Sequence, residues 1–188
     1  MEWFDKNATA IIAASAALLS ALIAGGFAIL NAWLTNNQNN QRLQLQIDHE
    51  KVRESKKLFL DKGEELFLCV DKWITSGHAH LLTGEKLLRK QITPEQRLNL
   101  LSSYTDGDNY TRMQTLLTIY FADLIEFKQE CSSNLMLCED VVDGFINGNY
   151  ADVGDALSAF KTYSDFFQTW SDEFSISLQK KLMKQVRN

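Results

Sequence analysis

A long uncharged segment near the N-terminus constrains this chain more than any other feature. Residues 7–41 contain no ionisable side chain, and the apolar part of this segment, residues 9–34, is rich in alanine. As an α-helix, the apolar part would be about 39 Å long, which exceeds the ~30 Å hydrocarbon core of a bilayer. The sequence therefore predicts a single membrane-spanning helix. This helix and the short tail before it make up residues 1–35.

The charges that flank the span predict its orientation. Lys6 precedes the span, whereas a larger basic group follows it, formed by Arg42, Lys51, Arg53, Lys56 and Lys57. By the positive-inside rule, we expect the N-terminus outside and the C-terminal body in the cytoplasm. A cleaved signal peptide has a basic leader and a shorter apolar stretch, so we expect the span to be retained. Trp3 and Trp33 are spaced for opposite membrane interfaces.

One face of the predicted span consists of small side chains. Alanines at steps of four and three residues form a seam: Ala10, Ala14, Ala17, Ala21, Ala24 and Ala28. Thr9, Ser20 and Asn31 lie beside this seam, and bulky apolar residues occupy most of the other half. Helices in a bilayer associate through small residues and interhelical hydrogen bonds, because lipid is as apolar as leucine.

Since the chain has one span, self-association is the economical inference from this face. We expect the six alanines to form helix-to-helix contacts and Thr9, Ser20 and Asn31 to line a narrow polar path. The path should select weakly among ions, because the span contains no charge. The alternative is a plain anchor, in which the seam arises from the abundance of alanine.

A neck of uncharged amides follows the span, formed by Asn36, Asn37, Gln38, Asn39, Asn40 and Gln41. It is compatible with a flexible linker, and equally with a continuing helix that places a collar of amides at a pore mouth. Beyond the neck, residues 42–188 are long enough for one cytoplasmic body. A heptad spacing of apolar residues predicts a long helix over about 41–75, and its members are Leu45, Val52, Phe59, Leu66 and Trp73.

The rest of the chain predicts an antiparallel helical bundle. We expect the stretch SGHAHLLTG to interrupt the first long helix, and a short helical piece to follow over 85–90. Thr93 as N-cap and Pro94 predict a helix that ends near Tyr104, and further helices are expected over 109–145 and 151–186. The fold class is therefore all-α, with a transmembrane helix that continues into a long helix and a bundle.

Composition argues against several classes of function. A net charge of −5 without an extended basic block disfavours direct binding of nucleic acid. His78 and His80 lack a third and fourth ligand nearby, so we expect no metal and no cofactor. The one Arg–His pair at a spacing used by helical ribonucleases, Arg42 and His49, lies beside the membrane. We therefore assign no catalytic residue.

The three cysteines indicate packing rather than chemistry. Their odd number and irregular spacing suggest a reducing compartment. Cys131 and Cys138 are seven residues apart on the apolar face of a predicted helix, too far apart along the axis for a disulfide. We therefore expect both thiols in the core.

The arrangement of the whole chain resembles small bacterial anti-phage membrane proteins. It is similar to the membrane accessory proteins of type VI-B CRISPR systems in its span, amide-rich neck and helical body, which contains RMQTLLTIYFADLIEF at 112–127. The cytosolic part of that family resembles HEPN bundles. The resemblance implies a HEPN-like bundle and an oligomeric pore that compromises the inner membrane of an infected cell. It also implies a cytoplasmic defence protein or CRISPR effector as a further partner.

Three functions follow as hypotheses from the sequence. The first is a homo-oligomeric pore, or a membrane-perturbing effector, that permeabilises or depolarises the inner membrane. The second is a membrane-tethered adaptor whose bundle binds a cytoplasmic protein. The third is a HEPN-type ribonuclease that acts through Arg42 and His49; the absence of a well-placed Arg–His pair favours the pore over this reading.

Overall fold

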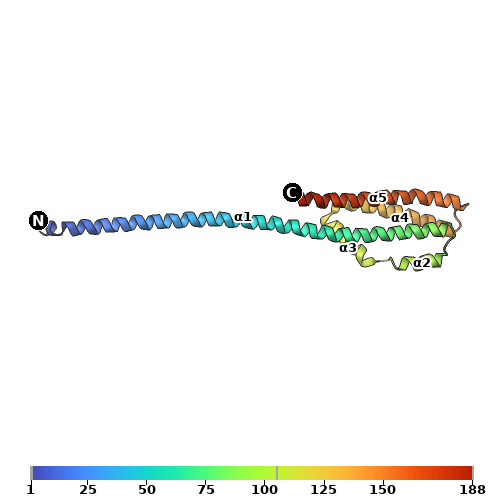
Figure 1. Cartoon of the computed structure of the whole chain (residues 1–188), viewed down its shortest axis with the longest axis horizontal. Coiled ribbons are helices and arrows are strands. Elements are labelled where there is room, and N and C mark those ends of the chain that lie inside the picture. The colour runs from blue at the N-terminus through green and yellow to red at the C-terminus, as the bar shows by residue number, and fades with distance from the viewer. Residues whose placement is uncertain (1, 105, 188) are drawn as a thin grey trace. The chain divides into compact units, whose positions relative to one another are not determined.

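The chain consists of helices joined by short connections (Figure 1). The structure is a computed structural model that describes residues 2–104 and 106–187, with no side chain described for residues 2–4 and 187. Its elements are α1 (Glu2–Leu88), α2 (Pro94–Ser102), α3 (Gly107–Tyr120), the 3-10 helix η1 (Ala122–Leu124), α4 (Ile125–Ile146) and α5 (Val153–Arg187). No strand occurs among the described residues, so the predicted all-α class is confirmed.

Contacts between residues divide the chain into two units, Met1–Ser55 and Lys56–Asn188. Residues 42–55, which the sequence pattern grouped with the bundle, fall in the first unit. Each unit is described by itself below.

The first unit is a continuous stretch of α1. All side chains from Thr9 to Ser55 are exposed in the isolated chain. The most apolar 18-residue window has a mean hydropathy of 2.1, and α1 is the one helix among the described residues that is long and apolar enough to cross a membrane. The neck, residues 36–41, is helical, so it continues the helix of the span and is not a flexible linker. The predicted interfacial position of Trp3 lies outside the described side chains.

The second unit encloses two apolar clusters. The first is built by α1, α3, η1 and α5 from Leu66, Cys69, Val70, Met113, Leu116, Leu117, Phe121, Leu124, Phe174 and Leu178. The second is built by α1, α4 and α5 from Leu81, Leu87, Leu88, Cys131, Cys138, Val141, Val142, Ala156, Phe160 and Phe167. Of the predicted heptad, Phe59, Leu66 and Trp73 belong to this core, whereas Leu45 and Val52 are exposed in the first unit.

Three glycines of α1 allow α5 to approach closely. A Cβ atom on Gly63 would overlap Leu182, one on Gly77 would overlap Phe167, and one on Gly84 would lie 2.9 Å from Phe160 Cε2. The residue numbers of these α5 partners decrease as the residue numbers of the glycines increase, so α5 runs antiparallel to this part of α1. Glycine costs a helix interior about 1 kcal/mol relative to alanine. Here, that cost is offset because large α5 side chains fill the space next to each glycine.

The predicted interruption at residues 76–84 is wrong, because α1 continues without a break to Leu88. The sequence pattern suggested a loop since the segment contains two glycines, but both glycines face bulky side chains of α5. The helix ends instead where Lys90 adopts a left-handed conformation, with φ of 60°. There, the Gln91 amide donates to the carbonyl of Lys86 at 2.8 Å, which closes the last turn.

The predicted single helix over 109–145 is also wrong, because the chain breaks at Phe121. Phe121 has an extended φ of −135°, is fully buried, and places its ring 4.9 Å from that of Phe59. Burial of this large ring in the core outweighs the helical bonds lost at the break. Apolar residues are nevertheless buried on both sides of the break, including the predicted Cys131 and Cys138: Met113, Leu117, Leu124, Cys131, Cys138 and Val142.

The start of α2 is confirmed in detail. Thr93 Oγ1 accepts a hydrogen bond from the Gln96 amide at 3.2 Å, and Gln96 Oε1 accepts one from the Thr93 amide at 2.9 Å. This reciprocal capping box satisfies two donors at the helix terminus, and Pro94 occupies the first helical position. The helix ends at Ser102, close to the predicted end near Tyr104.

Candidate functional site

The three residues predicted to line a polar path, Thr9, Ser20 and Asn31, differ in whether their side chains form hydrogen bonds within the helix. Ser20 Oγ donates to the carbonyl of Ala16 at 2.8 Å, within the same helix. Ser15, which the sequence analysis did not select, donates in the same way to the carbonyl of Ile11 at 2.7 Å. A hydroxyl that bonds its own backbone can be accommodated in lipid without a partner. Neither serine therefore requires a second helix.

Asn31 is different, because no side chain among the described residues bonds its exposed amide. Thr9 is exposed as well, and it is the first residue of the apolar stretch. An apolar segment about 39 Å long exceeds a ~30 Å core by about three residues at each end. If this helix crosses a bilayer symmetrically, Asn31 falls at the edge of the hydrocarbon, three residues before Leu34, and its amide would then need a partner.

The alanine seam forms one exposed face of the helix. At about 100° per residue, its members fall within an arc of about 80°. These six residues are Ala10, Ala14, Ala17, Ala21, Ala24 and Ala28, and all are exposed. Bulky side chains such as Leu22 and Ile29, each more than 70% exposed, cover other directions. The first unit thus offers one narrow face suited to another helix and a broad face suited to lipid.

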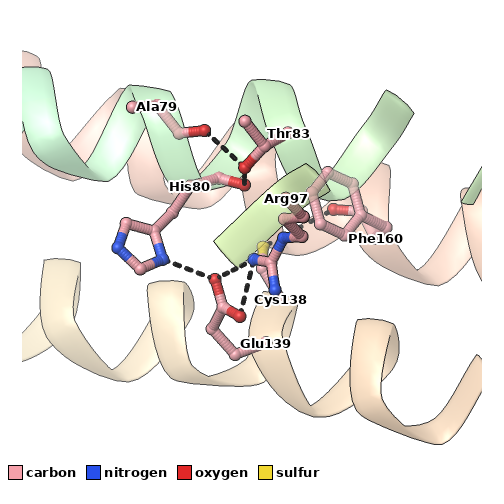
Figure 2. Close-up of polar contacts among 7 residues, drawn as sticks. All are labelled: Ala79, His80, Thr83, Arg97, Cys138, Glu139 and Phe160. Atoms are coloured by element: carbon pink, nitrogen blue, oxygen red, sulfur yellow. Dashed lines mark hydrogen bonds and ion pairs between the residues drawn. The ribbon is translucent and has the colours of Figure 1, made fainter. Parts of the chain in front are cut away.

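The second unit contains a cluster of charged groups from three helices (Figure 2). Arg97 on α2 donates from Nη2 to both carboxylate oxygens of Glu139 on α4, at 2.6 and 2.7 Å. His80 on α1 shares a hydrogen bond between Nδ1 and Glu139 Oε1 at 2.8 Å. The Arg97 side chain is only 8% exposed, so its charge depends on this carboxylate for compensation.

The cluster lowers the pKa of the Glu139 carboxyl. Burial raises this pKa, but the hydrogen bonds from His80 and Arg97 and their positive charge outweigh burial and hold the pKa below its usual range. Arg97 Nε is buried without a hydrogen-bond partner, so the guanidinium is incompletely satisfied. The cluster fastens the short helix α2 to α1 and α4.

His80 also lines an open pocket of about 640 Å³. The pocket is bordered by α1 and by the start of α3, and its lining includes Trp73, Ser76, Tyr104, Asn109 and Tyr110. The second ring nitrogen of His80 points away from Glu139 in Figure 2. A histidine held by a carboxylate can exchange protons or bind a polar group. This pocket is one concave surface of the second unit that includes a histidine.

Other residues considered from the sequence lie apart from one another. His78 bonds Gln168 on α5 through Nε2 at 2.7 Å, whereas His80 bonds α4, so the two histidines serve different helices. No group of three potential metal ligands occurs within the described residues. Arg42 and His49 are exposed in the first unit, and no other side chain of the described chain bonds either of them.

The thiols are core residues, as predicted for Cys131 and Cys138. Both are at most 1% exposed, and burial raises the pKa of each to about 12. The thiolate is the reactive form of cysteine, so these side chains are inert at neutral pH.

The Arg97–Glu139 pair is not predicted by the sequence pattern. One signal was available: Arg97 lies four residues before Leu101, on the buried face of α2. A buried arginine requires a carboxylate partner, but nothing in the local sequence identifies Glu139, 42 residues later.

No protein-family model, no curated protein and no solved structure matches this chain. The resemblance to type VI-B accessory proteins therefore stays a prediction.

Proposed function

We propose that this chain is a homo-oligomeric, single-span protein of the bacterial inner membrane whose assembled spans form a pore or a membrane-perturbing ring. The helical bundle would lie in the cytoplasm and the N-terminus outside, as the flanking basic residues favour. Leakage of ions through the assembly would depolarise the membrane, as an anti-phage effector does when it stops growth of an infected cell. A cytoplasmic defence protein or CRISPR effector would act as the trigger.

The observation that carries this proposal is the pairing of a small-residue face with the exposed amide of Asn31. An unsatisfied amide in an apolar environment costs about 1–3 kcal/mol, and a second helix that brings its own amide removes this cost. Because the chain has one candidate span among its described residues, other chains must supply that helix. Identical copies bring identical amides to the same depth, so self-association satisfies Asn31 most simply.

The same geometry describes the polar path. Asn31 would lie at the cytoplasmic mouth, followed by the helical neck of six amides, 36–41. Ser20, near the middle of the span, keeps an acceptor lone pair although its proton is bonded to Ala16. A path lined by alanine, one hydroxyl and a mouth of amides would be narrow and weakly polar, without a charged ring in the span.

Replacement of Asn31 tests the lining role. We expect Asn31→Leu to abolish or strongly reduce the single-channel conductance of the purified chain in planar bilayers. Ser15→Leu is the matched control, since it also exchanges a polar residue for leucine but points away from the seam, and it should conduct normally. Equal conductance of Asn31→Leu and the unmodified chain would remove Asn31 from the path.

A tethered adaptor is the second candidate, and the pocket beside His80 is the observation that favours it. In an adaptor, the span only holds the bundle at the membrane, so an unrelated leucine-rich anchor should replace it without loss. In a pore, that exchange should eliminate depolarisation of cells that produce the protein. Membrane potential measured with a voltage-sensitive dye separates the two.

A ribonuclease ranks below both candidates. Arg42 and His49 lie exposed on a helix of the first unit, and the described chain brings no third group to them. Loss of the cellular effect in Arg42→Ala or His49→Ala, with intact membrane leakage, would revive the enzyme.

A further inference from the structure

The segment between the neck and the second unit, residues 42–55, is a helix with an uncovered apolar stripe. We call it the stalk. Leu45 is 61% exposed and Val52 is 68% exposed, and they lie seven residues apart on one face. All side chains of the stalk are exposed, although most helical stability in proteins comes from packing. Lipid covers the span, but it does not cover residues that follow six polar amides.

The stalk continues the spacing of the span. Steps of seven residues connect Ala10, Ala17, Ala24, Asn31, Gln38, Leu45 and Val52. A second series, four residues later, connects Ala14, Ala21, Ala28, Thr35, Arg42 and His49. Parallel helices keep the same faces together over a long distance only when the heptad repeat continues without an insertion or a deletion. Chains inserted in one orientation are parallel by necessity.

Charges at the edges of this stripe select a second copy as the partner. When Leu45 and Val52 occupy heptad position d, a parallel neighbour brings Arg53 opposite Asp48, five residues earlier. These charges are opposite. When the two apolar residues are assigned to position a instead, the corresponding pair is Lys51 with Lys56, whose charges repel. The stalk sequence is therefore complementary to itself in parallel, in the phase of the alanine seam.

We infer that the stalk forms a parallel coiled-coil ring with the stalks of other copies, held by Leu45, Val52 and the Asp48–Arg53 pair between neighbours. This inference rests on the proposed self-association of the spans. Arg42 and His49 occupy the a positions. In a tight two-stranded core the arginines would meet without compensation, whereas in a larger ring they face a hydrated centre. The stalk thus fits an assembly of more than two chains.

Charge reversal tests the pair. In the detergent-extracted full chain, Asp48→Arg and Arg53→Asp should each weaken association by about fivefold, measured as the concentration dependence of particle mass. The double variant, with both charges exchanged, should restore the mass. Glu50→Arg, on the opposite side of the stalk, is the matched control and should associate normally. Unchanged association in both single variants would overturn the ion pair.

Cross-linking tests the stripe. With the three native cysteines buried, Leu45→Cys should form disulfide-linked dimers on mild oxidation in native membranes. Leu43→Cys, which faces roughly the opposite direction, should cross-link far less. Equal yields from the two positions would overturn the coiled coil.

The outcomes separate this inference from the proposed function. If Ala21→Leu in the span disperses the particle while the stalk variants change nothing, the spans assemble alone and the coiled coil is wrong. If the unmodified chain is monomeric, both the pore and the coiled coil are wrong.

Discussion

Arg97 and Glu139 are joined through one nitrogen, since Arg97 Nη2 contacts both carboxylate oxygens, at 2.6 and 2.7 Å. The arginine is the more buried partner, with a side chain 8% exposed against 29% for the glutamate. The glutamate also bonds His80, so one carboxylate serves two side chains from two other helices. The stability of the second unit should therefore be more sensitive to Glu139 than to either of its partners.

Glu139→Ala should destabilise the second unit by about 3 kcal/mol, because it leaves the buried guanidinium of Arg97 without a counter-charge. Urea unfolding of the detergent-solubilised chain, followed by near-ultraviolet circular dichroism, measures the change. Glu85→Ala provides the control, since it breaks an exposed pair with Arg89 and should cost less than about 0.5 kcal/mol. A similar loss for both variants would contradict the special role of the cluster.

Acid should destabilise the second unit partly through Glu65. Hydrogen bonds from Arg112 and Lys62 lower the pKa of Glu65 from 4.5 to about 2. Between these two pH values the unfolded chain binds a proton that the folded chain does not, so stability falls as pH falls from 4.5 towards 2. Above this range the contribution is fully present. Thermal melting as a function of pH should show a shallower acid slope for Glu65→Gln, and an unchanged slope would exclude Glu65 as a contributor.

Gly77→Ala should destabilise the chain by about 1–3 kcal/mol, although alanine usually stabilises a helix. The added Cβ overlaps the ring of Phe167, which is fully buried and has little freedom to move. Gly107→Ala should be nearly neutral, since a Cβ there meets nothing within 4 Å. The smaller side chain in Phe167→Leu should recover part of the loss when combined with Gly77→Ala. Thermal melting compares the four proteins, and a stabilised Gly77→Ala would refute the close contact.

Arg42→Glu should shift the ion preference of the assembled pore towards cations. In the proposed ring, Arg42 faces the axis beside the neck, so its reversal places a ring of negative charge at the mouth. The reversal potential under a salt gradient in planar bilayers measures this preference. Lys51→Glu makes the same change of charge away from the axis, and equal shifts in the two variants would argue against an axial Arg42.

Local sequence determined much of this protein. The N-cap at Thr93 and the first-turn Pro94 need only neighbouring residues, and both form as predicted. The seven-residue spacing that placed Cys131 and Cys138 in a core required only the periodicity of a helix. A segment able to cross a membrane follows from length and the absence of charge alone.

Tertiary structure decided the backbone conformation wherever the local preference of the sequence and the packing of side chains disagree. Gly77 and Gly84 predict a loop by themselves, but they remain helical because Phe167 and Phe160 occupy the space beside them. Phe121 belongs to an unbroken helical pattern, yet the chain breaks there so that its ring can enter the core beside Phe59. Arg97 finds Glu139 only when α2 and α4 are packed. Each of these outcomes depends on residues distant in the sequence, whose contact energies exceed the small local preferences of a helix.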